Sequence, residues 1–435
     1  MAHNKQLTYI DLFAGCGGLS LGLHWANWKG LFAIEKDTMA FETFFKNMIV
    51  PKASYQHFTD WPDWLPQTAH PIEVMLENPG YREQLAKFKE KVFLVTGGPP
   101  CQGFSVGGAR REHDPRNQLA FKFLEFVSIV QPKFVMIENV EGILRPFKAG
   151  FNGSKKSPAD CIKEELAKYG YSVGHIVASA VDCGVPQLRK RVIILGIREC
   201  PSEIDVSKLF GACFANAAGA QLKLLNLPLE HPVTVGEALE DLAGNNLVDC
   251  PDSPKYQTCK YLPPISVYAK LMRKNCLKEI IPNSHRFSCH GVKVLELYKK
   301  IHATQMPGRI SKEFLLANGT KSDKKVLLDT SLPATTITTH PDEQIHFKYP
   351  RNISVREMAR LQSFPDDFHF FGRYTLNGPR RKLDVSRNAQ VGNAIPPLLG
   401  MALGNSIELL LKTLETGDAR KYSKDVATQQ LTLMN

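Results

Sequence analysis

The stretch Phe93-Leu94-Val95-Thr96-Gly97-Gly98-Pro99-Pro100-Cys101-Gln102-Gly103-Phe104-Ser105 decides how the rest of this 435-residue chain is interpreted. Its apolar start predicts a buried strand, and the Gly-Gly-Pro-Pro cluster predicts a turn at the carboxyl end of that strand. Ligands of open parallel sheets bind at this edge. Cys101 stands on a stiff turn there and is the candidate nucleophile. A free cysteine packed in the core is the alternative, because free cysteines are often buried.

A glycine-rich segment near the N-terminus predicts a second ligand-binding turn. Tyr9-Ile10-Asp11-Leu12-Phe13-Ala14-Gly15-Cys16-Gly17-Gly18-Leu19-Ser20 is typical of a strand, a glycine loop and a helix. Glu35 follows the apolar run 30–34 and lies twenty residues after Gly15, the usual place for a carboxylate that binds ribose hydroxyls. Ser20 stands where a dinucleotide-binding loop has a third glycine, which favours a nucleoside cofactor without a pyrophosphate. A tight strand–helix turn is the alternative.

Further segments follow in a fixed order. The predicted strand 134–137 leads to Glu138-Asn139-Val140, Pro186-Gln187-Leu188-Arg189-Lys190-Arg191 precedes the strand 192–196, and Gln390-Val391-Gly392-Asn393-Ala394-Ile395-Pro396-Pro397 stands near the end. Singly, Glu138 could be a solvated strand end and the arginines a charged face. Together with the two glycine segments they resemble the DNA (cytosine-5)-methyltransferase family over most of the chain outside a middle region. Arg356-Glu357-Met358-Ala359-Arg360-Leu361-Gln362-Ser363-Phe364-Pro365 adds the family's late arginine-rich motif.

The resemblance implies catalysis by a covalent adduct. Carbon 5 of cytosine is a poor nucleophile, so the Cys101 thiolate first adds to carbon 6. The resemblance assigns Glu138 to ring nitrogen 3 and Arg191 to the base carbonyl, with Arg189 and Gln187 supporting the site. Carbon 5 then takes a methyl group from a sulfonium donor, and loss of its proton and of the thiol releases 5-methylcytosine. Pro-Pro followed by cysteine rather than by an aromatic residue indicates methylation of carbon.

The donor that the resemblance implies is S-adenosylmethionine. In this family Glu35 would hold the ribose and Asp60 the adenine amine. The segment around Asp60 diverges from the family pattern, and a carboxylate in a surface turn is the alternative there. Cys16 is also explained as a small packing residue in a tight turn. The residues carried over as cofactor-binding are Phe13, Gly15, Cys16, Gly17, Gly18, Leu19, Glu35, Asp60, Pro100, Leu119, Asn393 and Ala394.

The implied substrate is double-stranded DNA. The target base must swing out of the stack, at a cost of a few kcal/mol. Residues 103–118 contain glycines and arginines and are expected to form a mobile loop that closes over DNA, although a solvated connector would look similar. The expected DNA contacts are Gln102, Ser105, Arg110, Arg111 and Gln187.

Charge is unevenly distributed along the chain. The net charge is +11, and hydrophobic and charged residues make up 43% and 22% of the chain, which is ordinary for a globular protein. Residues 260–312 hold eleven Lys and Arg against two Glu, whereas residues 201–259 hold three Lys against eight acids. A basic block after an acidic one predicts a surface that faces a polyanion; a solvated charged face is the alternative.

The predicted fold is α/β. Residues 1–240 with 386–435 are expected to form a doubly wound, mostly parallel, Rossmann-like methyltransferase domain, closed by a helix at about 398–414. Residues 241–385, including the late arginine-rich motif, are irregular and are expected to form a smaller target-recognition domain.

The ten cysteines include no Cys-x-x-Cys pair, and the chain has no signal peptide or membrane-length apolar run. These features favour reduced thiols in the cytoplasm, without a membrane partner. No accessory reader or chromatin-targeting domain is visible in the sequence, which favours a bacterial enzyme. Cys276, His285, Cys289 and His290 fit no common zinc spacing, so no metal is expected.

Two other functions would use a similar sequence. An RNA cytosine methyltransferase would be expected to have a shorter recognition region than this chain has. A DNA-binding regulator that had lost its activity would not need Cys101, Glu138 and Arg191. The sequence therefore predicts a DNA methylase that acts as a monomer and protects DNA from a restriction endonuclease without forming a stable complex with it.

Overall fold

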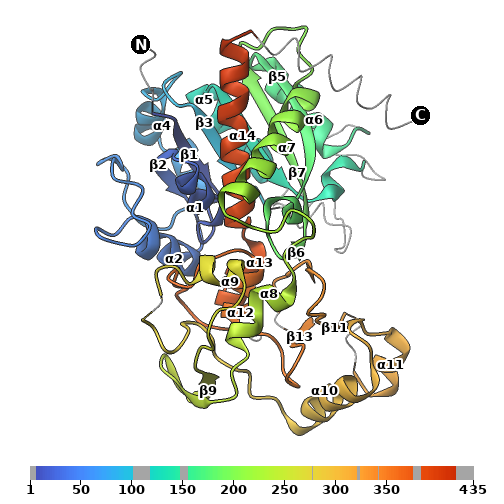
Figure 1. The fold of residues 1–435 in the computed structure, drawn as a ribbon. Coiled ribbons are helices and arrows are strands. Elements are labelled where there is room, and N and C mark those ends of the chain that lie inside the picture. The colour runs from blue at the N-terminus through green and yellow to red at the C-terminus, as the bar shows by residue number, and fades with distance from the viewer. Residues whose placement is uncertain are drawn as a thin grey trace, which may run out of the picture.

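The computed structural model describes residues 6–100, 118–146, 155–276, 278–320, 324–340, 342–375 and 384–417. The apolar runs of its N-terminal part form one six-stranded sheet in the order β2-β1-β3-β4-β7-β5 (Figure 1). Neighbours among the first four are parallel, and β7 runs antiparallel to both β4 and β5. The predicted mostly parallel, doubly wound sheet is confirmed. Its strands are β1 (Thr8–Leu12), β2 (Lys29–Ile34), β3 (Leu94–Gly97), β4 (Phe134–Asn139), β5 (Tyr171–Ser179) and β7 (Lys190–Arg198).

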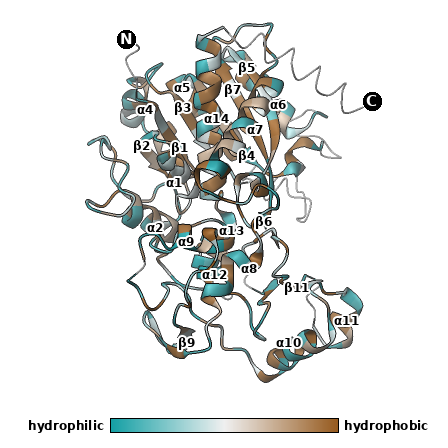
Figure 2. Ribbon diagram, viewed as in Figure 1, coloured by the Kyte–Doolittle hydropathy of each residue, from teal (hydrophilic) through white to brown (hydrophobic). Residues whose placement is uncertain are grey.

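Helices cover both faces of this sheet. The chain moves in opposite directions from β1 to β2 and from β3 to β4, so right-handed crossovers place α1 and α5 on opposite faces. On the first face α14 packs against α1 and α7, and on the second α5 packs against α3, α4 and α6. Apolar residues concentrate in the strands and the helices against them (Figure 2). The helices are α1 (Gly18–Trp25), α2 (Thr38–Met48), α3 (Ile72–Glu77), α4 (Pro79–Ala86), α5 (Leu119–Val130), α6 (Pro158–Lys168), α7 (Val206–Leu224) and α14 (Pro397–Glu415).

The C-terminal helix α14 meets α1 at backbone distance through Gly22. A Cβ on Gly22 would lie 2.4 Å from the Pro397 carbonyl oxygen and 2.5 Å from the Met401 nitrogen. The predicted helix at 398–414 is confirmed. The segment Arg387–Glu415 is long and apolar enough to cross a membrane, so the expectation that the chain has no such run is wrong. However, 78% of its most apolar window is buried inside the protein. Packing in the core therefore accounts for its composition.

Between residues 235 and 393 the chain forms mostly short helices and strands (Figure 1), and part of this region has a second, smaller core. That core consists of Leu297, Tyr298, Ile301, Ile310, Leu315, Leu327 and Ile345. The main core also takes in side chains of this region, among them Tyr268, Ile337 and Phe364, so it does not break at the predicted domain boundaries, which stay a prediction. The elements are α8 (Val235–Leu239), β8 (Leu247–Cys250), β9 (Ser253–Cys259), α9 (Val267–Met272), α10 (Val292–Thr304), β10 (Gly308–Arg309), α11 (Lys312–Ala317), β11 (Val326–Leu327), β12 (Ala334–Thr335), β13 (Gln344–Ile345), α12 (Val355–Leu361) and α13 (Arg387–Asn393). Strand β6 (Gln187–Leu188) pairs with β12, and the 3-10 helices are Glu141–Leu144, Ala180–Cys183 and Glu240–Leu242.

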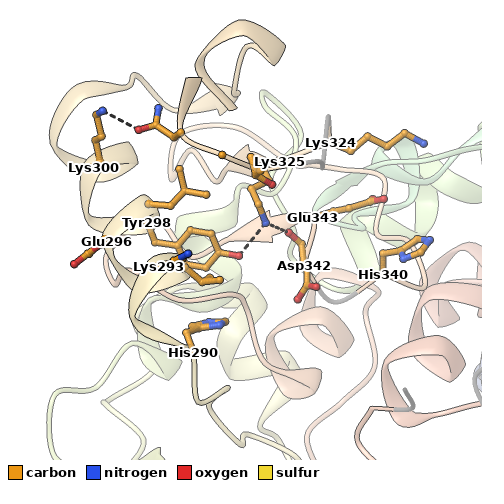
Figure 3. A pocket seen from close by; sticks show the side chains of 15 residues that line it. His290, Lys293, Glu296, Tyr298, Lys300, Lys324, Lys325, His340, Asp342 and Glu343 are labelled. Atoms are coloured by element: carbon orange, nitrogen blue, oxygen red, sulfur yellow. Dashed lines mark hydrogen bonds between the residues drawn. The ribbon is translucent and has the colours of Figure 1, made fainter. Parts of the chain in front are cut away.

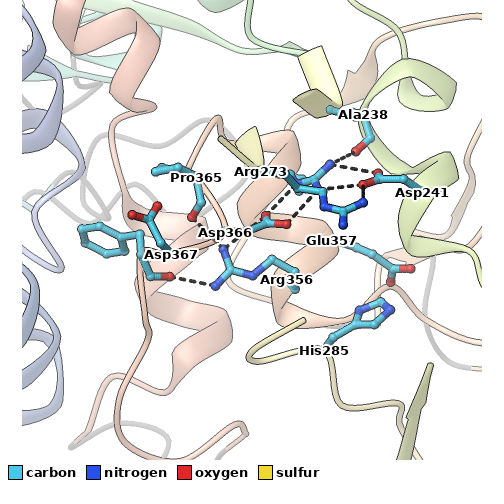
Figure 4. Close-up of polar contacts among 12 residues, drawn as sticks. Ala238, Asp241, Arg273, His285, Arg356, Glu357, Pro365, Asp366 and Asp367 are labelled. Atoms are coloured by element: carbon cyan, nitrogen blue, oxygen red, sulfur yellow. Dashed lines mark hydrogen bonds and ion pairs between the residues drawn. The ribbon is translucent and has the colours of Figure 1, made fainter. Parts of the chain in front are cut away.

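A buried ion network holds α12 to its neighbours (Figure 4). The Arg360 guanidinium donates to both carboxylate oxygens of Asp366, at 2.6 and 2.8 Å, and to both of Asp241, at 3.1 Å each. Arg273, at the end of α9, also pairs with Asp241. Arg356 donates to the carbonyls of Pro365 and Phe368. The arginines of the late motif are therefore internal connectors, and Arg273 of the basic block is buried with them.

Candidate active site

The carboxyl edge of the sheet brings together the segments that the sequence singled out. Leu12, at the end of β1, pairs with Ile34 of β2 and with Gly97 of β3, and Gly97 pairs with Ile137 of β4. The residues that follow each strand therefore start side by side. Phe13, Glu35 and Gly98 follow β1, β2 and β3, and Glu138 is the residue after Ile137, among the last residues of β4 that pair with β7.

Glu138 and Arg191 form an ion pair at this edge. The Arg191 Nε lies 2.7 Å from Glu138 Oε1, and the two side chains are only 13% and 14% exposed. Their strands β4 and β7 are antiparallel, with Glu138 opposite Ile193. A Cβ on Gly98 would lie 2.9 Å from Glu138 Oε2, so the carboxylate rests against the backbone of the Gly-Gly-Pro-Pro turn. Asn139 fixes the same turn by donating to the Pro99 carbonyl oxygen at 3.4 Å.

Five predicted site residues lie outside the part of the chain that the structure describes. They are the nucleophile candidate Cys101 and the expected DNA contacts Gln102, Ser105, Arg110 and Arg111.

The glycine loop after β1 has a constrained backbone. Phe13 has a φ of +60°, which is rare for a bulky residue, and Gly15 and Gly17 also have positive φ. The two glycines differ in their surroundings. A Cβ on Gly15 would meet nothing within 4 Å, whereas one on Gly17 would lie 2.9 Å from the Phe44 ring. Gly15 therefore borders open space, and Gly17 serves packing.

Glu35 lies beside this open space. Its carboxylate accepts hydrogen bonds from the backbone N–H groups of Gly15, at 2.9 Å, and Asp37, at 2.8 Å. Burial raises the pKa of Glu35, while these two hydrogen bonds act in the opposite direction. The carboxylate is thus held in place next to the loop.

The C-terminal part of the chain returns to the same loop. A Cβ on Gly18 would lie 2.2 Å from the Ile395 carbonyl oxygen and 3.3 Å from the Ala394 Cβ. Cys16 is buried, and its thiol contacts the Gln390 carbonyl oxygen at 3.6 Å. The predicted cofactor residues near both ends of the chain are therefore neighbours. Leu19 and Leu119 are buried in the adjoining core, Pro100 and Ala394 are half-buried, and Asn393 is exposed.

Arg189 and Gln187 are fully internal. The Arg189 guanidinium donates to the carbonyl oxygens of Ile337, Gly392 and Ala394 at 3.0 to 3.3 Å. The Gln187 amide donates to the Leu361 carbonyl and to Gln362, and it accepts from the Ile337 N–H. A DNA contact by Gln187 would have to break these hydrogen bonds. Both side chains brace the site from within.

Asp60 is not brought to the other predicted cofactor residues. Its carboxylate lies 2.5 Å from the Lys29 ammonium group and is 59% exposed. Lys29 begins β2, and Glu35 follows the end of that strand, about 20 Å farther along. The Lys29 ion pair also lowers the pKa of Asp60. This placement fits the alternative interpretation, in which Asp60 is a carboxylate in a surface turn.

The sequence did not single out three polar residues of the site. Gln362 donates to the Val391 carbonyl oxygen and so helps to hold the segment 390–395 against the glycine loop, a segment called the C-terminal return below. His70 reaches the carboxyl edge through a 2.9 Å hydrogen bond from its N–H to the Glu35 carbonyl oxygen. Asp11 is buried and accepts a 2.6 Å hydrogen bond from Ser20 Oγ. Only Asp11 had a usable signal, as a carboxylate inside an otherwise apolar strand.

The described residues contain no group of three or more His, Cys, Asp or Glu side chains arranged to hold a metal ion. His285, a member of the cluster considered for zinc, is fully buried and contacts Ser354 Oγ at 2.7 Å and the Leu242 carbonyl oxygen at 3.1 Å.

Comparisons with known proteins identify the family of the chain. The family model of the C-5 cytosine-specific DNA methylases matches residues 7–409. The chain is 30% identical over 411 residues to the type II methyltransferase M.DdeI of Desulfomicrobium norvegicum, covering 92% of this chain and 88% of that protein. It is 28% identical to the type II methyltransferase M1.HphI of Haemophilus parahaemolyticus, covering 92% and 87%. Among solved structures, a DNA modification methyltransferase encoded within an E. coli prophage superposes with a TM-score of 0.63 at 24% identity, over 94% of this chain and all of that one, a likeness of fold.

Proposed function

Because this chain belongs to the family of C-5 cytosine-specific DNA methylases and is a DNA (cytosine-5)-methyltransferase, we propose that it methylates cytosine within a specific double-stranded sequence through a covalent adduct on Cys101. The observation that carries the proposal is the Arg191–Glu138 ion pair, packed against Gly98. Gly98 precedes Cys101 by three positions in the sequence, and the Cys101 thiol is proposed to attack a base that is bound at this pair.

Three residues divide the reaction between them. The Cys101 thiolate adds to carbon 6 of the cytosine ring, and the electron pair of the 5,6 double bond becomes available at carbon 5. Glu138 holds a proton at ring nitrogen 3, which stabilises the added charge. Arg191 orients the carboxylate of Glu138 and contacts the base carbonyl. After carbon 5 has been methylated, loss of its proton and departure of the Cys101 sulfur restore the aromatic ring.

S-adenosylmethionine is the proposed cofactor, and it supplies an electrophilic methyl group on a sulfonium centre. The residues present fit such a group. Gly15 borders open space on its Cβ side, the half-buried Glu35 carboxylate can accept hydrogen bonds from ribose hydroxyls, and Asn393 is exposed nearby. The proposed pocket residues are Phe13, Gly15, Cys16, Gly17, Gly18, Leu19, Glu35, Pro100, Leu119, Asn393 and Ala394. Asp60 is left out because it pairs with Lys29.

The target base leaves the duplex before it reacts, since its carbon 6 is inaccessible in the stack. Gln102, Ser105, Arg110 and Arg111 are proposed to contact the opened DNA. Arg189 is proposed to position the site, because its guanidinium ties the C-terminal return to the segment at Ile337.

The biological role that we propose is protection of bacterial DNA from a restriction endonuclease. Both relatives described above are named type II methyltransferases. We further propose that the protein acts as a cytoplasmic monomer and forms no stable complex with the nuclease.

The test is bisulfite sequencing of genomic DNA from a methylation-free bacterial host that expresses this chain. Protected cytosines within one short recurring motif are expected. A genome without protected cytosines, despite folded protein, would contradict the proposal, and methyl transfer to RNA would then be assayed.

A further inference from the structure

A cavity of about 940 Å³ lies between α10 and the segments that lead into the strands β11 and β13 (Figure 3). One wall is formed by Lys293, Glu296 and Lys300 of α10. These residues share one face of the helix, because Glu296 and Lys300 lie three and seven positions after Lys293. Lys324, His340 and Glu343 line the opposite side.

The floor of this cavity is fixed by buried hydrogen bonds. The Lys325 ammonium group is buried and donates to Tyr298 Oη and to the Asp342 carbonyl oxygen, both at 3.0 Å. Tyr298 donates to Asn352 Oδ1, and Asn352 donates to the Asp342 carboxylate at 2.7 Å. These bonds link α10, β11 and the segment before α12. The walls are therefore ordered before a ligand arrives, which lowers the entropic cost of binding.

The rim of the cavity offers both hydrogen-bond donors and acceptors. Lys293, Glu296 and Lys324 are exposed, and none of them makes a hydrogen bond or ion pair with another residue that the structure describes. Glu343 already accepts a hydrogen bond from Thr338, and Lys300 donates to Asn318. The free groups are thus two ammonium groups and one carboxylate. Phosphate oxygens only accept hydrogen bonds, so a carboxylate adds nothing to a phosphate contact, whereas base edges in the major groove present donors and acceptors together.

A short chain of contacts joins this cavity to the site. Arg189 donates to the Ile337 carbonyl oxygen at 3.2 Å, and the next residue, Thr338, packs its carbonyl oxygen against Gly392. The Thr338 hydroxyl donates to Glu343 Oε2 at 2.7 Å, and Glu343 lines the cavity. The cavity is therefore linked through Ile337, Thr338 and Glu343 to Arg189, which lies two residues before Arg191 in the sequence.

We propose that this cavity reads the edges of base pairs next to the target cytosine, with Lys293 and Lys324 as donors and Glu296 as the acceptor. The inference rests on the proposed function and names the residues that set its sequence specificity. Lysine donates to the acceptors of guanine, and a carboxylate accepts from the amino group of cytosine.

The test compares the methylated motif of wild-type protein with those of Lys324→Met and Glu296→Gln. Each full-length chain is expressed in the methylation-free host, and its genome is sequenced after bisulfite treatment. Discrimination at one flanking position is expected to fall by about tenfold or more, so that sites with another base there become protected. Lys299→Met is the matched control, because Lys299 is exposed on α10 but does not line the cavity, and its motif should equal that of wild type.

Three outcomes would overturn the inference. If a variant methylates the same motif as wild type and to the same extent, the side chains touch no base. The same motif methylated more weakly at every site would indicate a phosphate contact instead. If a variant shows no methylation, the affinity of the purified protein is measured for duplexes that differ at each position in turn. An equal loss of affinity for all duplexes would overturn the inference, whereas a loss of discrimination at one position only would support it. Absence of methylation by the wild-type chain is a separate result that contradicts the proposed function itself.

Discussion

At the scale of single residues, the Glu138–Arg191 pair explains why glycine stands at position 98. The carboxylate leaves no room for a Cβ there, since that atom would lie 2.9 Å from Glu138 Oε2. The ion pair holds the carboxylate with one oxygen on Arg191 and the other toward the turn. A charge-assisted contact of this kind fixes orientation more firmly than a neutral hydrogen bond does.

Replacing Glu138 with Gln should slow methyl transfer about 10²- to 10⁴-fold, because the amide cannot supply a proton to the ring nitrogen. Single-turnover methyl transfer measures this effect, and fluorescence anisotropy checks that DNA affinity is kept. Glu141→Gln is the control, since Glu141 is exposed in the following 3-10 helix. A Glu138→Gln rate within threefold of wild type would contradict the assigned role.

Asp11 makes the stability of the fold depend on pH. Burial raises the pKa of Asp11 to about 7, with a smaller contribution from the charge of Glu35, while the Ser20 hydrogen bond opposes the rise. The folded protein therefore holds a proton that the unfolded chain has already lost above about pH 4. The contribution of this group to stability is complete below that pH and is lost as the pH rises toward 7.

Asp11→Asn should remove this dependence. We compare the difference in the free energy of unfolding, variant minus wild type, at two pH values. This difference should be about 2 kcal/mol larger at pH 7.5 than at pH 5. Denaturant titrations at the two pH values measure it, and Asp249→Asn, at an exposed position on β8, is the control. Parallel pH profiles for wild type and Asp11→Asn would show that Asp11 does not titrate in this range.

At the scale of elements, the arginines of the late motif join α12 to its surroundings. Arg360 reaches Asp366 within its own segment and Asp241 in the 3-10 helix after α8. All three side chains are nearly or fully inaccessible. Removing one member of such a network leaves a buried charge without its partner, which is costly in a low-dielectric interior.

Arg360→Leu should therefore lower the free energy of unfolding by about 3–5 kcal/mol. Arg309→Leu, at an exposed position on β10, should change it by no more than about 0.5 kcal/mol. Guanidinium unfolding followed by circular dichroism gives both values. An Arg360→Leu midpoint equal to that of wild type would show that the network adds nothing to stability.

At the scale of the whole molecule, the net charge of +11 should govern DNA affinity. Each phosphate contact releases a counterion, so the affinity for any duplex should fall at least about tenfold between 50 and 200 mM salt. Anisotropy titrations on duplexes with and without the recognised motif measure this change. Affinity that does not depend on salt would exclude an electrostatic role for the basic residues.

The sequence predicts the sheet well and the remainder less completely, for physical reasons. Short apolar runs that end in glycine or a carboxylate indicate parallel strands, so Glu35 and Glu138 could be placed at one edge. Asp60 could not be placed, because a lone carboxylate in a loop pairs with whichever cation lies nearby, here Lys29. The cavity between α10 and the segment that leads into β11 depends on residues far apart in an aperiodic segment, and no local pattern predicts that they meet.

The most direct measurement of the central claim is the mass of the protein after incubation with S-adenosylmethionine and a duplex that carries 5-fluorocytosine at the target position. The fluorine leaves no proton at carbon 5 to be removed, so the sulfur cannot depart. The account predicts that wild-type protein gains the mass of one methylated DNA strand and that Cys101→Ser gains none. A wild-type protein that methylates ordinary cytosine but forms no adduct, or an adduct that persists in Cys101→Ser, would contradict it.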